Sequence, residues 1–128
     1  MLEITPLYAS ALAILFLVLT VAVILRRGAT KVSLQCGDDR SLIQRVRRHG
    51  NFTETVPLAL LLLAMLELNG LTAGWVHTAG GMLLLGRVLH PLGIDTERAA
   101  HPLRIIGMGL TILMIAGSAL YLLFSAIG

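Results

Sequence analysis

Long apolar stretches alternate with shorter polar connections along the chain. The first stretch, residues 7–25 (LYASALAILFLVLTVAVIL), contains no charged residue and ends at Arg26 and Arg27. A bilayer core about 30 Å thick needs about 20 helical residues, so this stretch is long enough to span a membrane. The positive charges follow the apolar stretch, whereas in a cleaved signal peptide they precede it. The pattern predicts a retained first membrane helix over about residues 5–27.

The second apolar run, Val56–Leu68, is too short to cross a bilayer alone. Its helix must begin several residues earlier, and we expect it to cover about residues 45–69. The opening turns of this helix then contain Asn51 and Glu54, two polar residues that a membrane segment does not normally carry.

Two further apolar stretches predict helices over about residues 74–91 and 102–125. A charge-free turn rich in Asn and Gly, residues 69–74, precedes the third helix, and a polar segment, residues 90–104, leads into the fourth. Short connections favour antiparallel neighbours in one bundle. We therefore expect an all-α, integral membrane four-helix bundle that forms a single transmembrane domain, residues 1–128.

Composition and charge support a membrane protein. The chain is 56% hydrophobic and 13% charged, against about 25% charged in ordinary soluble domains. The formal net charge of +3 comes from basic residues in connections beside apolar runs, where they act as topology signals, so we expect no nucleic-acid binding. The positive-inside rule predicts that both charged connections are cytoplasmic and both termini lie outside the cytoplasm.

Polar residues of the second helix form a stripe. Arg47, Asn51 and Glu54 are spaced i, i+4 and i+7, which puts them on one helix face. A buried carboxylate without a partner costs several kcal/mol, so we expect Glu54 to have an internal partner, with Arg47, Arg87 and Arg104 as candidates, or to face a cavity and bind a ligand.

Other polar residues suggest less. Glu67 lies near the exit of the second helix, where interfacial water is a sufficient partner. The four histidines lack the spacing of a metal site, so no metal is expected. The single cysteine, Cys36, excludes an intrachain disulfide.

The residues of the second helix carry a family resemblance. The segment RRHGNFTETVPLALLLL resembles the second-helix pattern of the MAPEG family (membrane-associated proteins in eicosanoid and glutathione metabolism), with Arg47, Asn51, Glu54 and Pro57 at the matching positions. The segments GRVLH, residues 86–90, and PLRIIG, residues 102–107, resemble the end of the family's third helix and the start of its fourth. The resemblance covers nearly the whole chain.

The resemblance implies a homotrimer that binds glutathione between neighbouring subunits near the cytoplasmic side. Arg104 matches the arginine that stabilises the glutathione thiolate in catalytic members and is the expected catalytic residue. The expected glutathione-binding residues are Arg47, His49, Asn51, Glu54, Arg87 and His90. Ile43 and Gln44 replace a carboxylate and an arginine of the family pattern, which implies fewer contacts with glutathione.

The implied function is that of a glutathione-dependent transferase or peroxidase in the bacterial inner membrane. Its substrates would be lipophilic electrophiles or lipid hydroperoxides. Glutathione as the thiolate carries a net charge near minus two and needs cations, and an arginine near the sulfur favours the nucleophilic thiolate. The alternative is a non-catalytic member of the same fold that binds lipid or a protein partner.

Overall fold

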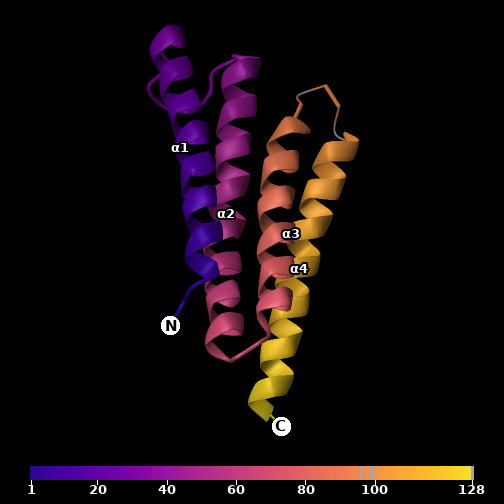
Figure 1. The fold of residues 1–128 in the computed structure, drawn as a ribbon. Coiled ribbons are helices and arrows are strands. Elements are labelled where there is room, and N and C mark those ends of the chain that lie inside the picture. Colours follow the sequence, from indigo (N-terminus) through magenta and orange to yellow (C-terminus); the bar gives the residue numbers. More distant parts are fainter. Residues whose placement is uncertain (96, 99, 128) are drawn as a thin grey trace.

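The computed structural model describes residues 1–95, 97–98 and 100–127, which form four α-helices (Figure 1). These are α1 (Thr5–Thr30), α2 (Arg40–Leu68), α3 (Ala73–Leu92) and α4 (Pro102–Ile127). Successive helices run in opposite directions, so the two termini lie at the same end of the molecule (Figure 1). The predicted all-α, four-helix fold is confirmed.

The largest difference from the predicted helix bounds is the start of α2. It begins at Arg40, several residues before the expected position, because Asp39 caps it. The Asp39 carboxylate accepts a hydrogen bond from the backbone nitrogen of Leu42 at 2.6 Å and pairs with Arg26 of α1 at 2.6 Å. Asn51 and Glu54 therefore lie well inside α2 and not in its opening turns.

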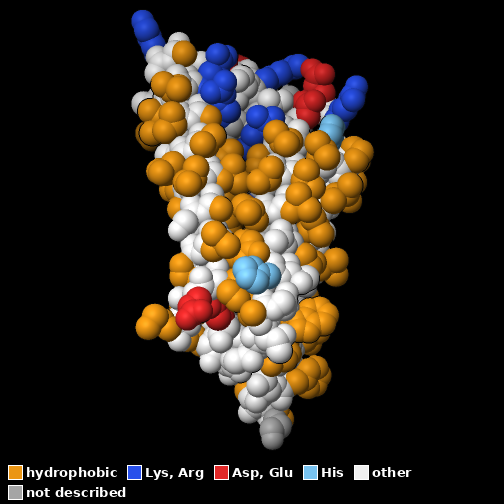
Figure 2. All heavy atoms as spheres, viewed as in Figure 1, with side chains coloured by type: hydrophobic (Ala, Val, Ile, Leu, Met, Phe, Trp, Pro, Cys, Tyr) orange, Lys and Arg blue, Asp and Glu red, His pale blue; other side chains and the backbone are white. Residues whose placement is uncertain are grey.

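The bundle core lies where α2 packs against the other three helices, each of which it contacts. The buried cluster contains apolar side chains from all four helices: Leu12, Leu19, Phe52, Val56, Ala59, Leu63, Val76, Leu83 and Met114. Many other apolar side chains face outward and cover the middle of the molecule (Figure 2). An apolar exterior of this kind is suited to contact with lipid acyl chains.

Three helices, α1, α2 and α4, are long and apolar enough to cross a membrane. We also expected α3 to span the membrane, but it is less apolar than the candidate spans of α1, α2 and α4. It carries Arg87 and His90 in its last turns. Both side chains are buried against neighbouring helices, so α3 presents neither charge nor imidazole to the exterior at these positions.

Lysine and arginine side chains gather at the end of the molecule where α1 and α3 end and α2 and α4 begin (Figure 2). We call this the basic end. At the opposite end, the sequence suggested that interfacial water is a sufficient partner for Glu67, but the structure gives Glu67 protein partners. Its carboxylate accepts hydrogen bonds from the backbone at the start of α1.

Glycines allow α3 and α4 to approach closely at the basic end. A Cβ atom on Gly107 of α4 would lie 2.6 Å from the His90 backbone nitrogen and 2.7 Å from the Gly86 carbonyl oxygen. A Cβ atom on Gly93, which follows α3, would overlap the backbone of Arg104. The first turn of α4 is thus seated directly against the end of α3.

Candidate functional site

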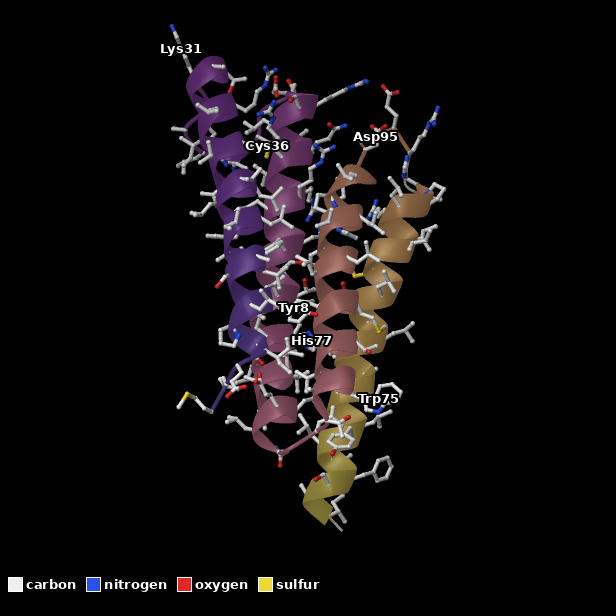
Figure 3. The ribbon with its side chains drawn as sticks, viewed as in Figure 1. Tyr8, Lys31, Cys36, Trp75, His77 and Asp95 are labelled. Carbon is white, nitrogen blue, oxygen red and sulfur yellow. The ribbon has the colours of Figure 1, made fainter. Side chains whose placement is uncertain are left out.

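A hollow of about 470 Å³ at the basic end brings together four of the predicted site residues, Arg47, Asn51, Glu54 and Arg104. Ile43 and Gln44 of α2 and Ile94 and Asp95 from the connection after α3 complete its lining. The hollow therefore draws on α2, on the connection after α3 and on the first turn of α4. Asp95 lies beyond the end of α3 at the basic end (Figure 3).

Helix geometry and close packing explain this convergence. Arg47, Asn51 and Glu54 share a face because they are spaced by about one turn of α2. Arg104 faces them from the first turn of α4, where the contact between Gly93 and the Arg104 backbone fixes its position. The convergence of these residues at one end of the bundle is thus a property of one subunit.

The hollow contains charges of both signs. Arg47 and Arg104 supply two guanidinium groups, and Glu54 and Asp95 supply two carboxylates. The Gln44 side-chain nitrogen donates a hydrogen bond to Asp95 at 3.1 Å. Such a lining suits a ligand that itself carries both carboxylate and ammonium groups.

The expected buried ion pair of Glu54 is not formed within the described part of the chain. Glu54 is exposed, and the ion pairs among the described residues are Arg26–Asp39 and Arg40–Glu97. The ion pair is absent from a single subunit because the stripe on α2 borders an open hollow and not the packed core, which leaves the expected ligand role of Glu54 as the alternative. Glu54 is therefore accessible to a ligand or to a neighbouring subunit.

Arg87 has a different environment from the one expected. Its side chain is 1% exposed and donates hydrogen bonds to Thr55 Oγ1 at 2.9 Å, to the Asn51 carbonyl oxygen at 3.4 Å and to the Gly107 carbonyl oxygen at 3.4 Å. Carbonyl and hydroxyl oxygens thus take the place of the carboxylate partner that we expected. Arg87 links α2 to α4 beside the hollow and holds the Asn51 turn in place.

The two predicted histidines do not line the hollow. His90 is buried, with its backbone against Gly107, at the α3–α4 contact. The ring of His49 packs on the ring of Phe16 of α1, with 5.2 Å between the ring centroids. Within one subunit, His49 therefore belongs to the α1–α2 contact and not to this site.

Sequence reasoning missed Asp95. The residue lies in an irregular connection, where neither the helical nor the strand period places a side chain on a face. The available signal was the close sequence proximity of Asp95 to the predicted end of the third helix, which already carried Arg87 and His90.

The chain is similar to known membrane proteins. The model of the MAPEG family matches residues 5–124. The chain is 33% identical over 90 residues to inner membrane protein YecN of Escherichia coli, in strain K12 and in strain O6:H1 CFT073. The matched region covers 70% of this chain and 69% of each relative. No solved structure matches the chain.

Proposed function

Because the chain belongs to the MAPEG family, we propose that it binds glutathione in the hollow at the basic end and uses the thiolate on lipophilic substrates. The reaction is conjugation to an electrophile or reduction of a lipid hydroperoxide. The protein acts in the inner membrane, a location supported by the names of its relatives in E. coli. In this proposal all four helices span the bilayer and the basic end faces the cytoplasm.

The charges in the hollow fit glutathione, which carries two carboxylates and one ammonium group. Arg47 and Arg104 match the carboxylates and the thiolate in sign, and Glu54 and Asp95 match the ammonium group. A volume of about 470 Å³ lies within the usual range of small-molecule sites, about 300–1,000 Å³. This complementarity within a single hollow is the observation that carries the proposal.

The residues act in two groups. Arg47, Asn51, Glu54 and Asp95 hold the peptide, and Arg87 keeps the Asn51 turn in position from behind. Arg104 stabilises the thiolate, because a nearby cation lowers a thiol pKa and so supplies a nucleophile at neutral pH. The second substrate reaches the sulfur from the adjacent bilayer.

The active form is a homotrimer in this proposal. One subunit leaves Glu54 exposed and the hollow open, so a neighbouring subunit is needed to enclose an anionic peptide. The mass of the purified protein in mild detergent, corrected for bound detergent, tests this assembly. A fully active monomer would contradict it.

Glutathione binding and turnover should be measured on the same purified protein. We expect calorimetric binding of glutathione together with glutathione-dependent turnover of an aryl halide or a lipid hydroperoxide. Arg47→Gln should weaken binding, whereas Arg40→Gln should not, because Arg40 is exposed and pairs with Glu97 outside the hollow. Binding without turnover across several electrophiles would favour the non-catalytic alternative, and no binding would refute the site.

A further inference from the structure

A second hollow of about 470 Å³ lies between α1 and α2, also towards the basic end. Its α1 wall is apolar and consists of Val18, Leu19 and Ala22, whereas its α2 wall is polar. The polar wall is formed by Ser41, Gln44, Arg45 and Arg48. Ser41, Arg45 and Arg48 are spaced i, i+4 and i+7, so they form a stripe distinct from the one that faces the glutathione hollow.

The two arginines of this hollow have no carboxylate partner among the described residues. Arg45 donates a hydrogen bond to the Ala22 carbonyl oxygen at 2.9 Å, and Arg48 donates one to the Ile94 carbonyl oxygen at 2.9 Å. The Nε atom of Arg48 is buried and has no hydrogen-bond partner. Because a guanidinium has five N–H donors, both side chains can still bind an anion.

The acidic side chain that interacts with Arg45, Asp39, does not neutralise this charge. Asp39 interacts with Arg45 electrostatically, but its carboxylate is already bound by Arg26 and by the Leu42 backbone nitrogen. The positive charges of Arg26, Arg45 and Arg48 therefore exceed the single negative charge of Asp39 in and beside the hollow.

The hollow lies about one helical turn below the level at which the charge-free stretch of α1 ends, at Arg26. Arg45 bonds to Ala22, which lies about 12 Å before the end of α1 at 1.5 Å per residue. On the hydrocarbon side of this level α1 presents exposed apolar side chains, including Ile14, Leu17 and Val18. Cationic side chains thus stand directly above an apolar surface that runs into the bilayer.

We propose that this hollow binds an anionic phospholipid of the surrounding membrane. Its phosphate accepts hydrogen bonds from Arg45 and Arg48, and one acyl chain lies along the apolar wall of α1. The cationic α2 wall and the apolar α1 wall together favour this occupant. A small soluble anion would leave Val18 and Leu19 uncovered, and a zwitterionic lipid would not neutralise the excess positive charge. The two hollows share Gln44 of α2, but their arginines differ, and lipid binding here does not depend on glutathione binding beside Arg47 and Arg104.

Thermal unfolding in detergent with added lipid tests the proposal. The wild-type protein should gain a higher Tm with phosphatidylglycerol than with phosphatidylcholine of the same acyl chains, and Arg45→Gln or Arg48→Gln should remove that difference. Lys31→Gln should retain it, because Lys31 is exposed at the far end of α1 (Figure 3). Equal shifts with both lipids in wild type would overturn the proposal, and so would an equal shift with inorganic phosphate alone.

A second measurement needs no variant. A phosphatidylglycerol probe with a photoreactive group near the start of one acyl chain should crosslink wild-type protein in vesicles within residues 14–22. A phosphatidylcholine probe with the same group should label this segment several-fold less. Equal labelling by the two probes, or phosphatidylglycerol labelling spread evenly over the apolar exterior, would refute the site even if the arginine variants failed to fold.

Discussion

Glu67 at the end of α2 accepts two hydrogen bonds from Thr5 at the start of α1, one from its backbone nitrogen at 2.7 Å and one from its hydroxyl at 2.6 Å. The same carboxylate accepts hydrogen bonds from the backbone nitrogens of Glu3 at 2.5 Å and Ile4 at 2.8 Å. The residue at the N-cap position of α1, Ile4, provides no side-chain cap of its own. Glu67 therefore caps α1 from a neighbouring helix. Its negative charge also interacts favourably with the positive end of the α1 dipole.

We predict that Glu67→Ala destabilises the protein more than Glu54→Ala. Removing the cap leaves the part-buried N–H groups of Ile4 and Thr5 without an acceptor, at a cost of about 2 kcal/mol. Glu54 is exposed and makes no ion pair among the described residues, so its loss should change stability little. Thermal unfolding in detergent without glutathione measures both effects.

Glu67→Gln separates charge from hydrogen bonding in this cap. It keeps one carbonyl oxygen as an acceptor and should fall between wild type and Glu67→Ala. A larger loss of stability for Glu54→Ala than for Glu67→Ala would contradict the proposed capping of α1 by Glu67. It would instead support the buried internal pairing first expected for Glu54.

Gly107→Ala should destabilise the bundle, because its Cβ atom would lie 2.6 Å from the His90 backbone nitrogen. Backbone atoms cannot move aside as a flexible side chain can, so α3 and α4 must separate, at a cost of about 1–3 kcal/mol. Gly109→Ala is the matched control, since nothing lies within 4 Å of its Cβ position. The control should be neutral or slightly stabilising, and equal Tm losses for both variants would exclude the proposed close contact.

The ion pair of Asp39 and Arg26 should make stability depend on acidic pH. The hydrogen bond from Arg26, together with the one from the Leu42 backbone, lowers the pKa of Asp39 below its ordinary value. The folded state thus binds this proton less readily than the unfolded state. The stabilisation is full above about pH 4, near the ordinary pKa, and is lost as the pH falls through the folded-state value.

Asp39→Asn tests this pH dependence. Asparagine can still cap α2 through its side-chain oxygen, but it carries no charge for Arg26. We expect the difference in Tm between wild type and the variant to shrink as the pH is lowered from about 5 to about 2. A difference that stays constant over that interval would show that the charge of Asp39 adds nothing to stability.

The fold and part of the site could be predicted because they depend on local periodicity. Apolar stretches of sufficient length predict helices, and the spacing of Arg47, Asn51 and Glu54 predicts a shared face. The partners of Glu67 and Arg87 could not be predicted in this way. Glu67 bonds to residues more than sixty positions away, and Arg87 bonds to oxygens on two other helices. Such contacts depend on the tertiary arrangement, which residue spacing does not encode.

The last prediction concerns Arg104 and depends on the proposed function. Arg104 lines the hollow at the first turn of α4. Arg104→Ala should leave glutathione bound through Arg47, yet return the pKa of the bound thiol towards about 8.5 and slow turnover at pH 7 by about tenfold for each pKa unit regained. Arg104→Lys should restore activity only in part, because a point charge replaces a planar fork of donors. The measurement is the ultraviolet absorbance of the thiolate against pH at saturating glutathione, with Arg98→Ala as a control, since Arg98 is exposed in the preceding connection. If the thiol pKa and the rate of Arg104→Ala match those of wild type, Arg104 is not the thiolate-stabilising residue.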